Sequence, residues 1–258
     1  MKAELRGLPK DLAEVVAGHL VTAGRLVDED PELAYRHAEA ARRRAARLPV
    51  VREAAAETAY AAGHWDVALS EFRALRRMTG TDDFLPVMAD CERALGRPAA
   101  ALKIAKEVRR KKLEPALAIE MIIVESGARS DLGQQAEARR VLHQAILDLD
   151  NRQIAQIGVP VARLYYAYAN VLEDLDRPGE ARSWFDDAAR LDTDGETDAD
   201  ERRDLLDGML ISFDDDALDA EDDHSEGDDS EDAGSEHSHG EDAGGDPATL
   251  ADREGPQR

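Results

Sequence analysis

Apolar residues recur every three or four positions along most of the first 191 residues, a spacing typical of helices rather than of half-buried strands. The pattern predicts ten helices and no strand. They span residues 10–27, 31–47, 50–62, 65–78, 82–95, 98–111, 115–131, 134–150, 158–175 and 178–191. Pro31 and Pro98 suit the first turn of their helices, where a backbone N–H has no partner to lose. Residues 151–158 are predicted as turns or ragged helix ends.

A short sequence motif returns along these helices, in which a turn residue is followed five positions later by an alanine. The alanines are Ala34, Ala68, Ala101, Ala138 and Ala181, with steps of 34, 33, 37 and 43 residues. The turn residues are Gly63, Gly96 and Gly133, with Glu29 and Asp176 as departures. A glycine at this point lets a helix end in the left-handed conformation without a steric penalty. Such a period predicts an array of helical repeats.

Each unit resembles a tetratricopeptide repeat (TPR), a helix–turn–helix module. Besides the turn residue and the alanine, the likeness rests on an aromatic residue four positions later, met by Phe72 and Phe185. It covers roughly residues 10–191. The resemblance implies an all-α, right-handed solenoid of about five repeats. It also implies that the first helix of each repeat lines a concave groove, whereas the second lies on the convex side.

Seven aromatic residues follow the helical spacing inside the repeats, which predicts packing within and between repeats rather than ligand contact. They are Tyr60, Trp65, Phe72, Tyr165, Tyr168, Trp184 and Phe185.

Charge divides the chain into two unlike parts. The formal net charge is −23, yet residues 1–191 are almost balanced at −1 and residues 192–258 carry −22. Residues 214–258 combine many acids with almost no apolar side chain, so we predict a disordered acidic tail. The predicted domains are therefore a repeat array at 1–191, a linker and capping helix at 192–213, and the tail.

The capping helix is predicted from one apolar face formed by Leu205, Leu206, Met209, Leu210 and Phe213. A fixed cap would shield the last repeat from water. The alternative is a detachable amphipathic motif that docks into a groove of this chain or of a partner.

Basic residues concentrate in the second helices of the early repeats and predict a basic ridge. Its members are Arg43, Arg44, Arg76, Arg77, Lys106, Arg109 and Arg110. One interpretation is an ordinary solvated surface. A second is a phosphate-binding surface for RNA, DNA or the ribosome, although no aromatic residues are interleaved for base stacking. A third is a salt-sensitive contact with the acidic tail.

The sequence holds no motif of a known catalytic class and no phosphate-binding loop. With one cysteine, Cys91, neither an intrachain disulfide nor a cysteine-rich metal site is expected. His224, His237 and His239 stand among tail carboxylates without a rigid spacing, so no metal or cofactor is predicted. No membrane span or signal peptide is expected, and a cytoplasmic location is predicted.

These observations favour a non-catalytic scaffold that binds a peptide or helix of another protein in the concave groove. This expectation follows from the fold-level resemblance. The alternative is a nucleic-acid- or ribosome-associated factor that uses the basic ridge, with the tail as modulator. The abundant alanine and arginine indicate a GC-rich, actinobacterial-like bacterial genome.

Overall fold

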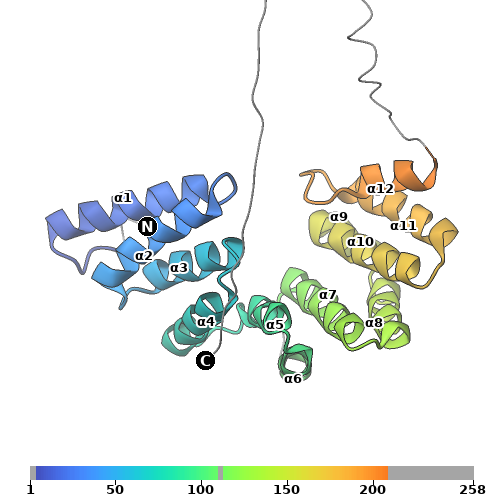
Figure 1. Ribbon diagram of the computed structural model, residues 1–258, viewed down its shortest axis with the longest axis horizontal. Coiled ribbons are helices and arrows are strands. Elements are labelled where there is room, and N and C mark those ends of the chain that lie inside the picture. The colour runs from blue at the N-terminus through green and yellow to red at the C-terminus, as the bar shows by residue number, and fades with distance from the viewer. Residues whose placement is uncertain (1–3, 110–112, 209–258) are drawn as a thin grey trace, which may run out of the picture. The chain divides into compact units, whose positions relative to one another are not determined.

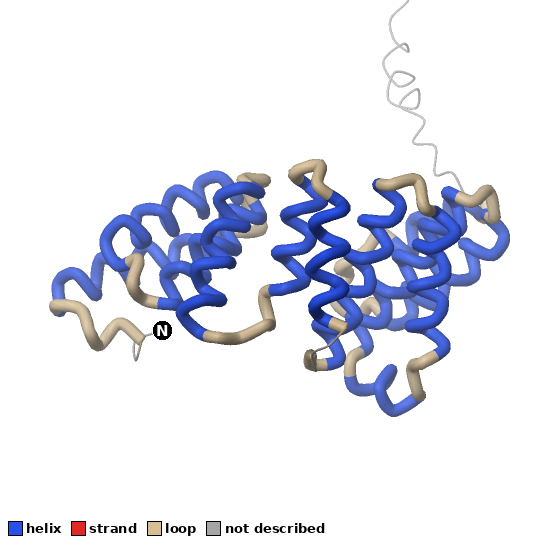
Figure 2. Tube along the Cα trace, turned by 90° about the horizontal axis from the view of Figure 1, so that it is seen from below, coloured by secondary structure: helices blue, strands red, loops and turns tan. Residues whose placement is uncertain are grey.

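The computed structural model describes residues 4–109 and 113–208, which form helices and connecting turns with no strand in either range (Figures 1 and 2). The helices of these ranges are α1 (Lys10–Leu26), α2 (Pro31–Ala45), α3 (Pro49–Ala61), α4 (Trp65–Thr79), α5 (Leu85–Ala94), α6 (Pro98–Val108), α7 (Pro115–Asp131), α8 (Gln135–Leu147), α9 (Asn151–Gln156), α10 (Gly158–Asp174), α11 (Pro178–Leu191) and α12 (Ala199–Leu206). The all-α prediction is confirmed, and each of the ten predicted repeat helices is present.

The prediction for residues 151–158 was wrong over its first six residues, which form the short helix α9. A capping box starts this helix. The Asp150 carboxylate accepts the backbone N–H of Gln153 at 2.7 Å, and the Gln153 side chain accepts the N–H of Asp150 at 3.0 Å. Two otherwise unpaired backbone donors are thereby satisfied, so a local cap starts a helix without a long apolar period. The insertion of α9 accounts for the long last step between repeats.

Four of the five repeat turns share one backbone conformation, whereas the turn at Glu29 lacks it. Gly63, Gly96 and Gly133 have φ values of 75°, 71° and 71°, and Asp176 adopts the same left-handed region at 57°. Around each of them two backbone hydrogen bonds close the first helix of the repeat, as in the bond from the N–H of His64 to the carbonyl of Ala59. This pairing is the Schellman motif. The fourth turn therefore keeps the geometry of the others without their glycine.

Proline marks the opposite end of many helices. The first residue of five of the described helices is a proline, namely Pro31, Pro49, Pro98, Pro115 and Pro178. Its fixed φ angle suits a first helical turn, and its missing N–H removes a donor that has no partner there. The first helices α3 and α7 carry both signals, a proline at the start and a left-handed glycine after the end.

The helices pack in sequential order. Within each repeat the two helices contact each other, as in the pairs α1–α2, α3–α4, α5–α6, α7–α8 and α10–α11. Between repeats, first helices also meet first helices, since α5 packs on α7 and α7 on α10. Each repeat thus covers an apolar face of its neighbour, which is how an α-solenoid builds one continuous core.

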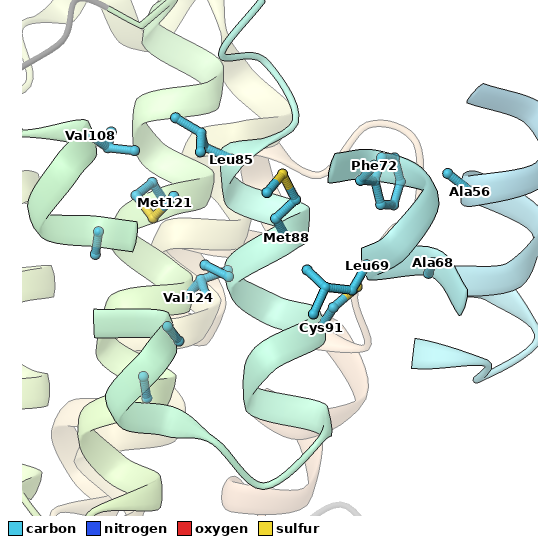
Figure 3. Close-up of a cluster of buried hydrophobic side chains, with 14 of the residues drawn as sticks. Ala56, Ala68, Leu69, Phe72, Leu85, Met88, Cys91, Val108, Met121 and Val124 are labelled. Atoms are coloured by element: carbon cyan, nitrogen blue, oxygen red, sulfur yellow. The ribbon is translucent and has the colours of Figure 1, made fainter. Parts of the chain in front are cut away.

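The interior is built from small residues between larger ones. All five repeat alanines are at most 1% exposed, Phe72 is 2% exposed and Phe185 is fully buried. Figure 3 shows the cluster in the middle repeats, where Leu69 and Phe72 on α4 face Met88 and Cys91 on α5. Alanine at the crossing points lets the helix backbones approach closely, and leaves the volume between them for leucine, methionine and phenylalanine.

Three buried glutamates join successive repeats electrostatically. Each is under 10% exposed and pairs with two arginines, at least one of which comes from the preceding repeat. Glu71 pairs with Arg42 and Arg52, Glu92 with Arg73 and Arg97, and Glu125 with Arg109 and Arg129. A buried carboxylate without such partners would be strongly unfavourable, so these pairs also fix how each repeat sits on the next.

The helix α12 closes the described part of the chain by packing on α11. Ala199 is buried, and Leu206 packs against the core of the last repeats. The Arg182 guanidinium donates two hydrogen bonds to Asp207, at 2.8 and 2.9 Å. Met209, Leu210 and Phe213 of the predicted apolar face lie outside the described residues, as does the acidic tail.

Candidate functional site

A cavity of about 490 Å³ opens along the first helices of four repeats. It lies within the size range of ligand-binding pockets. Its lining comes from α3, the segment entering α5, α5 itself, α7 and α10, whose labels can be followed in Figure 1. The lining residues are Tyr60, Asp83, Phe84, Pro86, Val87, Asp90, Arg93, Leu117, Glu120, Ile123, Val124 and Arg163. We call this cavity the first-helix groove.

One side of the groove is held by a chain of hydrogen bonds across three repeats. The Tyr60 hydroxyl on α3 donates to Asp90 Oδ2 on α5 at 2.6 Å. Arg93 donates through Nη1 to Asp90 Oδ1 at 3.0 Å and through Nε to Asp131 Oδ2 at 2.8 Å. Burial raises the pKa of Tyr60 well above its usual range, and the bond to Asp90 raises it further. The phenol therefore stays protonated and serves as a donor at neutral pH.

The other side of the groove carries a second ion pair. Arg163 on α10 contacts Glu120 Oε2 on α7 at 2.9 Å and lies 3.7 Å from Glu196 Oε2 in the segment before α12. Burial raises the pKa of Glu120. The positive charge of Arg163 opposes that rise, whereas the negative charges of Glu196 and Asp90 add to it. The positive charge of Arg163 therefore offsets only part of the cost of ionising the Glu120 carboxyl in this place.

An apolar strip runs between these polar groups. Phe84, Val87, Leu117 and Ile123 are each half-buried on the groove. The Phe84 ring stacks on Phe72 with ring centroids 5.6 Å apart, which anchors it to the core. Leu117, in contrast, lies outside the buried clusters of the described chain. The Leu117 side chain therefore contributes little to the packing of the core.

A second cavity of about 580 Å³ adjoins the groove. Trp65, Gly96, Pro98 and Asp131 contribute to it, and it shares Asp90 and Arg93 with the first-helix groove. The Arg93 guanidinium thus lines both hollows and bridges Asp90, which also lines both, to Asp131, which lines the second.

Three of the six ridge residues that the structure describes are found in ion pairs. Arg43 contacts Glu39 at 3.0 Å, Arg109 contacts Glu125 at 2.6 Å, and Arg76 contacts both Asp82 and Glu107. Arg44 donates to the carbonyl of Ala40 at 2.7 Å, while Arg77 and Lys106 are exposed. Arg110 lies outside the described residues. Half of the described ridge cations are therefore paired with carboxylates of the same array.

The described residues offer little to metal or thiol chemistry. In residues 4–109 and 113–208 no three histidine, cysteine or carboxylate side chains are arranged to hold a metal ion. Cys91 is fully buried, and burial raises its pKa to about 12, so the reactive thiolate is scarce. His224, His237 and His239 fall outside the described ranges. None of the helices described is both long and apolar enough to span a bilayer.

The sequence did not single out the polar residues of the groove. Asp90, Arg93, Glu120 and Arg163 look like ordinary surface charges on amphipathic helices. One signal was available: Asp90 and Arg93 are three residues apart on a first helix, and in the TPR resemblance first helices face the groove. Tyr60 was predicted as packing. It does contact Trp65 with ring centroids 5.1 Å apart, but it also lines the groove.

Comparison with known proteins agrees with this architecture. No protein-family model matches the sequence, and no curated protein matches it. Among solved structures, the chain is similar to the crystal structure of a thermophilic TPR protein from Thermus thermophilus, with a TM-score of 0.56 and 18% sequence identity. The similarity covers 74% of this chain and 98% of that protein. At this identity the likeness shows the fold, an array of TPR-like helical hairpins, and the fold alone.

Proposed function

We propose that the chain is a non-catalytic scaffold that binds a peptide segment or helix of another protein in the first-helix groove. A TPR-like fold is in general suited to protein interaction, because stacked repeats create an extended binding surface. The single cysteine fits a reducing compartment, so we place the scaffold in the cytoplasm.

The observation that carries the proposal is the composition of the groove. Three repeats contribute half-buried apolar or aromatic side chains to one cavity, a fourth contributes Arg163, and hydrogen-bonded charges border them. Concave sites with an apolar lining and a few fixed polar groups are the usual form of a binding site. Leu117 strengthens the argument, since it faces the groove without belonging to a core cluster.

Nucleic-acid binding through the basic ridge has less support. Affinity for nucleic acid depends mainly on cations that are free to neutralise phosphates. Arg43, Arg76 and Arg109 are already paired with carboxylates of the array. A phosphate group would have to displace the carboxylate from each of these arginines before it could form an ion pair.

A peptide selection with matched variants tests the proposal. Peptides are selected by display on the immobilised full chain, and their dissociation constants are then measured in solution. Leu117→Gln should weaken the selected peptides about tenfold or more, the loss expected when a buried leucine contact is removed. Leu147→Gln is the matched control, because Leu147 is 65% exposed on α8 and lies outside the groove. Equal effects of the two substitutions would refute the groove as the binding site.

A further inference from the structure

Carboxylates outnumber cations around the first-helix groove. Three carboxylates and two guanidinium groups line the groove. Each guanidinium also pairs with one further carboxylate that is not part of the lining. The acids are Asp83, Asp90, Glu120, Asp131 and Glu196, and the bases are Arg93 and Arg163. The groove therefore carries a negative surplus, although residues 1–191 as a whole are almost neutral.

The two arginines have no remaining capacity to offset this surplus. Arg93 is shared between Asp90 and Asp131, and Arg163 is shared between two glutamates. Asp83 is exposed at the mouth and makes no ion pair with the described part of the chain. A cation entering the groove would meet carboxylates that are incompletely neutralised.

The electrostatic surroundings of Glu120 also favour a cationic ligand. Burial raises the pKa of this carboxyl, and the nearby negative charges of Glu196 and Asp90 raise it further despite Arg163. A second positive charge placed beside Glu120 would stabilise its ionised form. An anion at the same place would raise the cost of ionising Glu120.

The apolar strip adds a second requirement for the ligand. Phe84, Val87 and Leu117 line the same cavity as Asp83 and Glu120. A simple polycation would leave these side chains in water. A ligand with apolar and cationic side chains on neighbouring positions satisfies both parts of the groove.

We propose that the first-helix groove selects a basic amphipathic segment of another protein, and that Asp83 and Glu120 receive its arginine or lysine side chains. This inference rests on the proposed function and deepens it by naming the chemistry of the partner. Residues 192–258 of this chain carry a net charge of −22, which is the wrong sign for the groove.

Three synthetic peptides test the selection by fluorescence anisotropy with the full chain. The first combines leucine and arginine at amphipathic helical spacing. The second replaces each leucine by glutamine at the same charge, and the third replaces each arginine by glutamate. We expect the leucine–arginine peptide to bind at least about tenfold more tightly than either of the others. The glutamine–arginine peptide measures attraction to the acidic residues 214–258, which hold almost no apolar side chain.

Groove variants then locate the effect. Glu120→Gln and Asp83→Asn should each weaken the leucine–arginine peptide about two- to fivefold, whereas Arg163→Gln should strengthen it by a similar factor. The double variant Glu120→Gln/Arg163→Gln keeps the net charge and should bind like the parent. Glu137→Gln on α8 and Asp228→Asn in the acidic segment are the matched controls and should change nothing. Circular dichroism on each variant verifies that the fold is retained.

The possible outcomes separate the two proposals. If Leu117→Gln weakens binding but the arginine and glutamate peptides bind alike, the groove binds peptides and the selection for cations is wrong. If the two arginine peptides bind alike and the groove variants are silent, binding occurs at the acidic segment and both proposals fail. Opposite effects of Glu120→Gln and Arg163→Gln on the leucine–arginine peptide support both.

Discussion

The Arg93 guanidinium lies against the backbone of Gly127, so close that a Cβ added at Gly127 would stand 2.4 Å from Arg93 Cζ. Gly127 is a helical residue of α7, where glycine would otherwise be a poor choice. Its missing side chain is what allows Arg93 to reach both Asp90 and Asp131. The position of Arg93 in both cavities therefore depends on a glycine.

Gly127→Ala should displace Arg93 with little loss of stability. The alanine gains about 1 kcal/mol of helix propensity, which opposes the loss of two partly buried ion pairs, each worth on the order of 1 kcal/mol. We expect urea unfolding to change by less than about 1 kcal/mol. The Arg93 side-chain NMR signals should shift strongly. Gly18→Ala on α1, where an added Cβ meets nothing, is the control and should simply stabilise. An unmoved Arg93 signal in Gly127→Ala would contradict the proposed steric role.

A glycine in place of Asp176 should make the array more stable. Asp176 holds a left-handed conformation at φ 57° that three other repeat turns give to glycine, and it places a negative charge after a helix C-terminus. Asp176→Gly should stabilise the array by about 0.5–1 kcal/mol in chemical denaturation. Gly96→Ala, the reverse change at an equivalent turn, should destabilise by about 1 kcal/mol. Effects of the same sign at both turns would argue against their equivalence.

Removing one partner of a buried carboxylate should be costly. Burial opposes ionisation of Glu125, but the hydrogen bonds from Arg109 and Arg129 outweigh it and lower the pKa of the carboxyl. Arg129→Gln leaves this buried charge with one partner, so we expect a loss of about 1–3 kcal/mol in urea unfolding. Arg140→Gln removes an exposed pair with Glu137 and should cost less than about 0.5 kcal/mol. A comparable loss in both variants would contradict the importance of burial.

The pair His19 and His37 should make stability depend on pH. Their Nδ1 atoms lie 3.0 Å apart between α1 and α2. Burial lowers the pKa of His19 below 6.5, and the charges of His37 and Arg44 lower it further. Because the folded state resists protonation, this contribution to stability is complete above the unfolded pKa of about 6.5 and declines as the pH falls below it.

Thermal unfolding between about pH 5 and pH 8 checks this sign. The melting temperature of the parent chain should fall below about pH 6.5, and His19→Gln should reduce that fall. His64→Gln serves as the comparison, since His64 pairs with Glu32 at 2.8 Å and contacts an acid instead of a second imidazole. A pH dependence unchanged by His19→Gln would exclude the pair as its source.

Two adjacent leucines on α12 distinguish a fixed cap from a detachable motif. Leu206 packs against the core of the last repeats, whereas Leu205 is 54% exposed. Leu206→Asp forces a charge against apolar side chains and should destabilise the array by about 1–3 kcal/mol. Leu205→Asp should be nearly neutral. If both changes leave unfolding unaltered, α12 is a detachable motif.

Local sequence determined the helices, their ends and the repeat register. A helix of 3.6 residues per turn imprints its period on consecutive residues, and glycine or proline acts on the backbone at its own position. For this reason Gly96 and Ala101 mark the third repeat in the sequence alone. The sequence pattern did not reveal α9, because its six residues are too few to show an apolar period and it depends on the capping box of Asp150 and Gln153.

Tertiary structure alone decided which charges meet. Tyr60 and Arg163 lie far apart in the sequence but line one cavity, because the stacking of repeats determines which first-helix side chains face the same space. The ion pairs within the basic ridge follow the same rule, because Arg109 meets Glu125 only when the third repeat packs on the fourth. A helical period specifies which face a residue occupies, but its charge partner depends on the distance to another helix, which no local pattern encodes.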